Sequence, residues 1–270
     1  MAVHFCGCAV SEPRPSASVI LVRDGPAGLE SFMLRRHAKS AVAPSAYVFP
    51  GGTVRDDDLD VVLLVENRDA LARAISARSD MPIAPDEAAA LYVCAARELF
   101  EEAGVLLVRN AAGRLLSVDP ADTSLQERLE STRLALQARE LAIGDVLEEH
   151  GWRPALDLLV PFSHWITPRA VSARFDTRFF VAELPAGQSA LHDTIETSEG
   201  VWLTPARALE ADYHTVYPTE QHLLRLAPFQ TVSDLLIFAR GKPIRMVSPA
   251  IVGDSEARRL EIRADIVDAW

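Results

Sequence analysis

The sequence predicts an α/β fold in which one long helix separates an N-terminal hairpin from later strands. Residues 17–23 form a continuous apolar run typical of a buried strand, and residues 30–35 form a second strand-like run. Gly25 and Gly28 bracket a turn between the two runs, so we expect an antiparallel hairpin. Farther along, apolar residues recur at helical spacing over 91–99, which predicts a helix with one side in the core.

Residues that typically begin or end helices set the bounds of that helix, and further patterns predict the other elements. Pro85 followed by two acidic residues predicts its start. Gly104 predicts its end, because glycine accepts the left-handed backbone that closes many helices. Residues 121–150 carry leucines at loosely helical spacing and predict a helix pair. Further strands are expected at 106–108, 179–182 and 200–203, and a helix followed by an extended stretch at 231–249.

Composition bounds the architecture and excludes two classes of partner. With 270 residues, 49% of them hydrophobic, the chain can bury one sizeable core with an elaborated flank. Lys and Arg total 27 and Asp and Glu total 38, which gives a net charge of −11. The sequence contains no run of basic residues, so nucleic acid is not an expected partner. No apolar stretch reaches the roughly 18 residues of a membrane span, and the N-terminus lacks a secretory pattern. We therefore expect a soluble, cytoplasmic protein.

Three carboxylates on one arc of the central helix suggest metal chemistry. At 3.6 residues per turn, Glu102 lies about 40° from Glu98, and Glu101 lies about 60° from it on the other side. Such like charges repel. Arg97, four residues before Glu101, offsets part of the repulsion, and hard cations with oxygen ligands remove it far better. The pattern indicates Mg²⁺ or Mn²⁺ held against a phosphate for hydrolysis of a phosphoanhydride; the alternative is a solvated acidic helix face.

A glycine pair upstream of the helix favours the metal interpretation. Phe49-Pro50-Gly51-Gly52 follows a strand-like stretch, and two glycines let a backbone turn approach another backbone or a metal closely. Together with this loop, residues 97–105 (RELFEEAGV) resemble the Nudix box. Its consensus runs glycine, five residues, glutamate, seven residues, then Arg-Glu-apolar-x-Glu-Glu-x-Gly-apolar. Residues 97–105 match the second half at every fixed position.

The sequence departs from this consensus in two ways. Gly52 precedes Arg97 by 45 positions rather than fourteen, so about 31 residues are inserted. The first glutamate of the box should fall eight positions before Arg97, where the chain has Ala89. Glu87 or Asp86 are candidate replacements, but neither has the right spacing.

A long insertion inside the box is characteristic of one branch of the Nudix hydrolases, which includes the mammalian peroxisomal coenzyme A diphosphatases. Five segments resemble this branch: residues 32–36, 44–52, 165–168, 174–180 and 196–202. The resemblance implies an α/β/α sandwich with a mixed sheet. It also implies a single Nudix hydrolase domain over residues 1–270, with helical insertions at about 55–85 and 121–150.

The resemblance also assigns roles to residues of this sequence. As metal ligands it implies Glu98 and Glu102, with the carbonyl of Gly51 as a further ligand and Glu101 as ligand or base. Arg97 belongs to the same catalytic tract. The residues implied to contact substrate or complete the site are Arg36, Gly52 and a later glutamate, either Glu199 or Glu196.

The implied function is metal-dependent cleavage of a diphosphate linkage in a nucleoside diphosphate derivative, with coenzyme A or acyl-coenzyme A as the substrate of the branch. NADH, ADP-ribose and nucleoside triphosphates remain alternative substrates. A Nudix fold that binds a nucleotide without cleaving it is an alternative of a different class, to which Ala89 and the enlarged box point. Dimers are common in the family, so a homodimer is one of the expected states.

Overall fold

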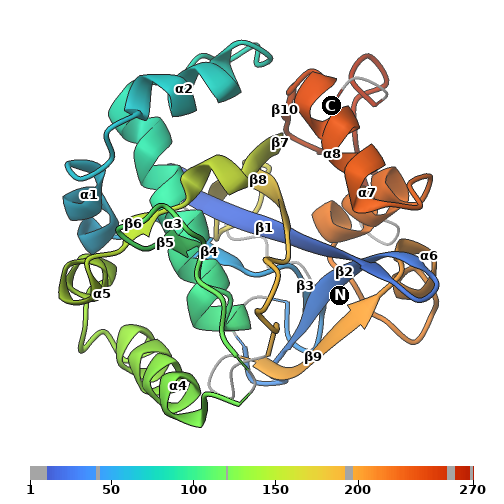
Figure 1. Cartoon of the computed structure of the whole chain (residues 1–270). Helices are drawn as coiled ribbons and strands as arrows, with labels where there is room; N and C mark the ends of the chain where they lie inside the picture. Colours follow the sequence, from blue (N-terminus) through green and yellow to red (C-terminus); the bar gives the residue numbers. More distant parts are fainter. Residues whose placement is uncertain (1–10, 41–42, 120, 192–196, 254–258, 268–269) are drawn as a thin grey trace.

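A twisted mixed sheet forms the centre of the molecule (Figure 1). The computed structural model describes residues 11–40, 43–119, 121–191, 197–253, 259–267 and 270. In these residues, eight strands form one sheet in the order β10-β7-β8-β1-β2-β3, with β4 beside β1 and β9 beside β2. The strands are β1 (Arg14–Gly25), β2 (Gly28–Arg36), β3 (Tyr47–Val48), β4 (Gly51–Thr53), β7 (Val160–Ile166), β8 (Phe175–Glu183), β9 (Thr197–Leu203) and β10 (Met246–Val247).

Strand β1 organises this sheet because it pairs with three others. Residues 22–25 pair with β2 in the predicted antiparallel hairpin, which closes where Gly25 faces Gly28. Residues 16–18 pair instead with β4, so the glycine loop is hydrogen-bonded directly to the central strand. Along its other edge β1 runs parallel to β8. The sheet is therefore mixed, and the short β4 strand has a fixed place on it.

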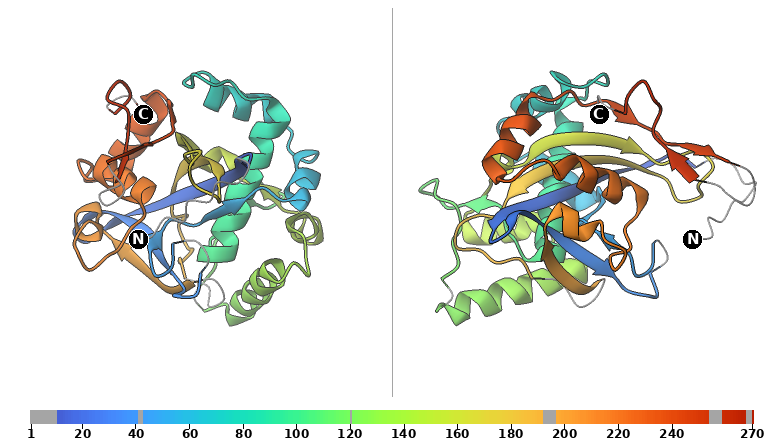
Figure 2. Two further views of the ribbon diagram at one scale, coloured as in Figure 1. Left: turned by 180° about the vertical axis from the view of Figure 1, so that it is seen from behind. Right: turned by 90° about the vertical axis from the view of Figure 1, so that its right-hand side faces the viewer.

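Helices cover both faces of the sheet, as Figures 1 and 2 show. One core cluster contains apolar residues of α1, α2, α3, α4 and α5. A second cluster contains residues of α6, α7 and α8. The predicted α/β/α sandwich is confirmed. The helices are α1 (Asp56–Val62), α2 (Arg68–Ser76), α3 (Pro85–Ala103), α4 (Thr123–Gln137), α5 (Ile143–His150), α6 (Pro205–Ala208), α7 (Tyr217–Leu226), α8 (Val232–Gly241) and the 3₁₀ turn η1 (Leu156–Leu158).

Helix α3 has the predicted bounds and lies deeper than an amphipathic surface helix. It begins at Pro85, where a missing amide hydrogen costs nothing, and it ends at Gly104, whose φ of 69° is left-handed. The amide of Gly104 donates to the carbonyl of Phe100. From Ala88 onward nearly every residue is buried, because the sheet covers one side and the flanking helices cover the rest.

Short ladders lie outside the main sheet. A strand was expected at residues 106–108; the strand found there is β5 (Val108–Arg109), which pairs with β6 (Arg153–Pro154) outside the main sheet, and Arg109 also forms an isolated bridge with Leu115. Near the C-terminus, β11 (Ala250–Val252) pairs with β12 (Arg259–Glu261). Among the described residues, no helix combines the length and apolar character that a membrane crossing requires.

A buried histidine in the second core cluster predicts sensitivity to acid. His222 is fully buried, its Nε2 lies 2.6 Å from the Ser163 hydroxyl, and its Nδ1 lies 2.5 Å from the Pro218 carbonyl. Burial lowers the pKa of His222 to about 3. Because the unfolded chain takes up this proton near pH 6.5 and the folded chain does not, stability should fall as pH drops below 6.5.

The expected loss from this histidine is about 1.4 kcal/mol per pH unit between roughly pH 6 and 4. Urea unfolding at several pH values measures the slope. A His222→Gln variant should be less stable at pH 7 and should have a shallower slope in the acid range. An unchanged slope would assign the acid sensitivity to other groups.

Candidate active site

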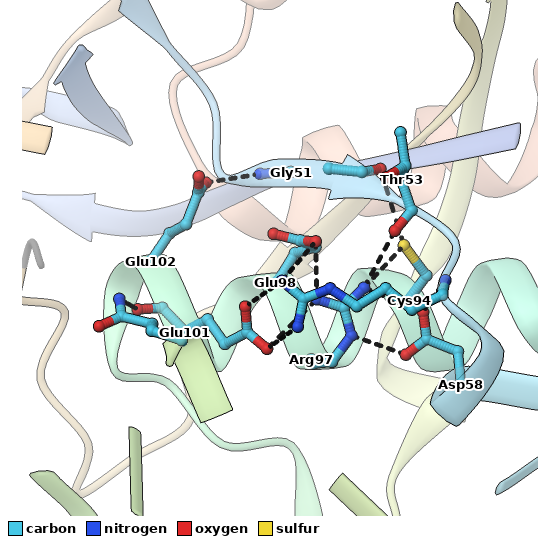
Figure 3. A network of polar contacts seen from close by, with 11 residues as sticks. Gly51, Thr53, Asp58, Cys94, Arg97, Glu98, Glu101 and Glu102 are labelled. Atoms are coloured by element: carbon cyan, nitrogen blue, oxygen red, sulfur yellow. Dashed lines mark hydrogen bonds and ion pairs between the residues drawn. The ribbon is translucent and has the colours of Figure 1, made fainter. Parts of the chain in front are cut away.

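The C-terminal half of α3 directs its charged side chains toward the β4 loop (Figure 3). Glu98, Glu101 and Glu102 are only 6%, 3% and 5% exposed, and Arg97 has no exposed surface. The three carboxylates therefore do not form a solvated acidic helix face. Burying three negative charges is unfavourable unless positive charge or hydrogen-bond donors compensate them, so their partners define what the site can do.

Arg97 is the fixed centre of this charge network. Its Nε and Nη2 atoms donate to the two carboxylate oxygens of Asp58 at 2.7 and 2.9 Å. Its Nη1 donates to Glu98 at 2.7 Å. Burial alone would lower the pKa of Arg97, but the hydrogen bonds to Asp58 and the charge of Glu98 outweigh it and raise that pKa. The guanidinium thus stays charged and orients Glu98.

Asp58 is an acidic residue of this network that was not predicted from the sequence. Counting back from Arg97 leads to Ala89, which is fully buried in the apolar core and takes no part in the site. Counting forward from Gly52 by six positions, as the consensus begins, leads to Asp58. The insertion therefore lies after the first acidic residue, not before it. Asp58 has no exposed surface, and its position was readable from the glycine.

Arg55 forms a second set of ion pairs in the cluster. Its Nη1 and Nη2 atoms donate to the two oxygens of Glu101 at 2.8 and 2.9 Å, and Nη2 lies 4.0 Å from Glu98. Its backbone amide donates to Asp58 at 2.9 Å, where α1 begins. Arg55 was not predicted as a site residue, because a lone arginine before an acidic turn has no distinctive spacing.

The glycine loop packs so closely against strand β1 and Glu98 that a side chain at either glycine would collide with them. The amide of Gly51 donates to Glu102 at 2.8 Å. A Cβ on Gly52 would lie 2.3 Å from an oxygen of Glu98, and one on Gly51 would lie 2.5 Å from the carbonyl of Ala17. Both glycines are therefore required by close approach, as expected from the sequence.

Replacing Gly52 by alanine should displace Glu98 and reduce the rate of the diphosphate cleavage that the sequence leads us to expect. A shift of about 1 Å in a catalytic group can cost on the order of 100-fold in rate, and the new methyl group leaves Glu98 no room in its present position. Steady-state kinetics with Mg²⁺ measures the effect. Gly241→Ala is the control, because a Cβ there meets no atom within 4 Å. Equal rates for both variants would contradict the close packing.

Burial leaves the negative charge of the cluster only partly compensated. It raises the pKa of Glu98, against the opposing effect of Arg97. It also raises the pKa of Glu101 to about 7, although Arg97 and Arg55 act in the other direction. A divalent cation would reverse both shifts by adding positive charge beside the oxygens.

A cavity of about 400 Å³ opens beside the cluster. Gly51, Gly52 and Glu98 line it. The arginines in its wall are Arg14, Arg36, Arg55 and Arg139. The Nε of Arg36 is buried and has no hydrogen-bond partner among the described residues. Two larger cavities, of about 750 and 540 Å³, are not lined by any of the three glutamates. With four arginines in its wall, this cavity is suited to an anionic ligand.

The donor set fits Mg²⁺ or Mn²⁺, although the carboxylates are engaged elsewhere. Three carboxylates beside a backbone loop supply the oxygen ligands that hard cations prefer. Within the described residues, no three acidic, His or Cys side chains already converge on one point. The reason is visible in their partners: Arg97 binds Glu98, Arg55 binds Glu101, and Gly51 binds Glu102.

The late glutamate expected from the resemblance is not brought to this cavity. Glu199 accepts a hydrogen bond from Tyr47 at 2.8 Å and lies 3.8 Å from Arg35. Val201 and Leu203, at alternate positions of the same strand, pack in the second core cluster. Because side chains alternate along a strand, Glu199 faces away from α3. Glu196 lies outside the described residues.

A buried Arg-Glu-x-x-Glu-Glu tract facing a Gly-Gly strand on a mixed sheet defines a Nudix hydrolase. Residues 8–218 match the family model described as the NUDT19 Nudix domain, and the chain belongs to this family. The resemblance found in the sequence is thus confirmed.

Among similar proteins, the acyl-coenzyme A diphosphatase NUDT19 of Xenopus laevis is 31% identical over 238 residues, covering 76% of this chain and 62% of that protein. The Homo sapiens protein of the same name is 29% identical over 270 residues, covering 86% of this chain and 69% of that protein. A crystal structure of a Nudix hydrolase from Alicyclobacillus acidocaldarius superposes with a TM-score of 0.63 at 25% identity, covering 85% of this chain and 97% of that one.

Proposed function

We propose that this chain is a Mg²⁺- or Mn²⁺-dependent diphosphatase that hydrolyses the phosphoanhydride of coenzyme A or acyl-coenzyme A. The observation that carries the proposal is the buried cluster of Glu98, Glu101 and Glu102 beside an arginine-lined cavity. The names of the relatives support the substrate, since they are acyl-coenzyme A diphosphatases over most of the chain's length.

In this proposal the acidic residues bind the metal ion and accept the proton of the attacking water. Glu98, Glu102 and the Gly51 carbonyl are the ligands, with Glu101 as a further ligand or as the base. Bound Mg²⁺ or Mn²⁺ supplies positive charge at the phosphate oxygens and lowers the pKa of water. Glu101, whose pKa is raised to about 7 by burial, is suited to accept the proton of the attacking water.

The remaining residues position these groups and the substrate. Arg97 has no exposed surface, so it acts by orienting Glu98 rather than by touching the substrate. Gly52 leaves room for a phosphate beside Glu98, and Arg36 offers donors from the cavity wall. Water attacks one phosphorus and the other phosphate departs, so no covalent enzyme intermediate is needed.

The arginines of the cavity favour coenzyme A among diphosphates. Coenzyme A carries a phosphate monoester on its ribose in addition to the diphosphate, whereas NADH and ADP-ribose carry the diphosphate alone. Four arginines line a cavity in a protein with a net charge of −11. Arginine binds phosphate through paired hydrogen bonds, so this concentration of donors suits the more highly charged ligand.

Incubation with Mg²⁺ and a substrate panel tests the proposal. Phosphorus NMR should show coenzyme A and an acyl-coenzyme A converted to phosphate monoesters faster than NADH, ADP-ribose or a nucleoside triphosphate. A preference for NADH or ADP-ribose would overturn the substrate. Ligand-induced thermal stabilisation with no monoester from any member of the panel would instead indicate a Nudix fold that binds without cleaving.

A further inference from the structure

The bidentate contact of Arg55 with Glu101 places a positive side chain where the proposed function needs a metal ion. Its two terminal nitrogens occupy one site on each oxygen of Glu101, at 2.8 and 2.9 Å. The same group lies 4.0 Å from Glu98. A carboxylate held in this fork geometry has its best-directed lone pairs engaged. Arg55 and a cation therefore compete for the same oxygens.

We infer that Arg55 is a displaceable counter-ion, which holds Glu101 while no cation is bound and turns to the phosphate of the substrate when a cation takes its place. This inference rests on the proposed function, because it presupposes that Glu101 and its neighbours bind metal. It assigns to Arg55 a role in positioning and in coupling two binding events.

The two arginines of the cluster differ in their freedom to move. Arg97 is completely buried and is tied by two bonds to Asp58 and one of 3.1 Å to the Thr53 carbonyl. Arg55 keeps 17% of its side chain exposed and lines the cavity. Its backbone is anchored by the bond from its amide to Asp58. The side chain alone can therefore swing while its base stays in place.

The cavity gives the released guanidinium a second partner. Arg55 shares the cavity with Arg36, Gly51 and Gly52, which stand where the substrate phosphates are proposed to bind. A guanidinium binds phosphate with the same fork geometry that it uses for a carboxylate. Cation binding should therefore make Arg55 available to the phosphate, and phosphate binding should favour the cation in return.

Metal binding to the whole protein in the absence of substrate tests this role directly. Mn²⁺ affinity is measured at pH 8 from the free-ion electron paramagnetic resonance signal, for wild type, Arg55→Gln and Arg139→Gln. The Arg55 variant should bind Mn²⁺ about tenfold more tightly, within the usual range of site-to-site coupling. Arg139 lines the same cavity but forms no ion pair with any described residue, so its variant should stay within about twofold of wild type.

The outcomes separate the inference from the function on which it rests. Unchanged or weaker Mn²⁺ binding by a folded Arg55→Gln protein would overturn the counter-ion role while leaving the diphosphatase in place. Equal tightening by Arg139→Gln would overturn it too, because general charge would then explain the effect. If wild type took up no Mn²⁺ at all, the proposed function would fall and the inference with it.

A second measurement uses the unmodified protein and does not depend on the stability of a variant. In ¹⁵N-arginine NMR, a bidentate guanidinium rotates slowly and gives separate terminal nitrogen signals. Saturating Mg²⁺ should merge the signals of Arg55, assigned by their loss in Arg55→Lys, while those of Arg97 remain separate. Signals of Arg55 that stay separate in saturating Mg²⁺ would overturn the displacement.

Discussion

Replacing Asp58 by alanine should lower the free energy of unfolding by about 3–5 kcal/mol, the usual cost of leaving one member of a buried ion pair alone. Asp58 and Arg97 have no exposed side-chain surface, and two hydrogen bonds of 2.7 and 2.9 Å join them. Without the carboxylate, the guanidinium keeps its charge and loses two of its acceptors. The total free energy of unfolding of a folded domain is only about 5–15 kcal/mol, so this loss would remove a large share of it. Urea unfolding measures it.

Matched variants separate the buried pair from the charge of α1 in general. Asp60→Asn removes a carboxylate from an exposed position of the same helix and should change stability by no more than about 0.5 kcal/mol. Combining Asp58→Ala with Arg97→Met should cost less than the sum of the single changes, because both buried charges are then gone. A loss below about 1 kcal/mol in Asp58→Ala would show that Arg97 finds another partner.

Glu102→Gln should reduce turnover by about 1000-fold while leaving the fold intact. Loss of groups that merely support metal ligands typically costs 10–100-fold, and removal of a charged ligand should cost more. The fold should survive because the Gln carbonyl can still accept the bond that the Gly51 amide donates to Glu102 at 2.8 Å. Initial rates with coenzyme A over a range of Mg²⁺ concentrations measure the effect.

The control for this change lies on the same helix. Glu87→Gln makes the same chemical change in the first turn of α3, at an exposed position far from the cavity, and should retain the wild-type rate. Thermal melting of both variants checks that the fold is preserved. If well-folded Glu102→Gln protein retained turnover close to wild type, Glu102 would not be a metal ligand.

Elements whose ends are marked by glycine or proline were predictable from the sequence. The β1–β2 hairpin is marked by Gly25 and Gly28, and α3 by Pro85 and Gly104, and all four lie where the structure needs them. Strand β7 was not predicted. Its sequence, VPFSHWI, begins with a proline-containing stretch and is buried on both faces at nearly every position, including two polar residues, so it has no alternating pattern to detect.

The site shows the same division between local and long-range information. The tract from Arg97 to Glu102 and the pair Gly51–Gly52 could be recognised because their spacing is characteristic. The partners that hold the tract, Asp58 and Arg55, are distant in sequence and only the fold reveals their contacts. Glu199 is the opposite case: the segment around it resembles the family, but strand alternation turns its side chain to the other side of the sheet.

Asp58 is close in sequence to Gly51 and Gly52. The contact between the two parts of the enlarged box therefore depends little on the number of residues inserted between them. Asp58, the anionic partner of Arg97, lies in the first turn of α1, shortly after the strand β4 that carries the glycines. Of the 38 residues between Asp58 and Arg97, those between α2 and α3 lie outside both helices, so we expect a change in their number to leave the contact of Asp58 with Arg97 in place. The connection between α2 and α3 is therefore the place where sequence can be trimmed or grafted with the least effect on the charge network.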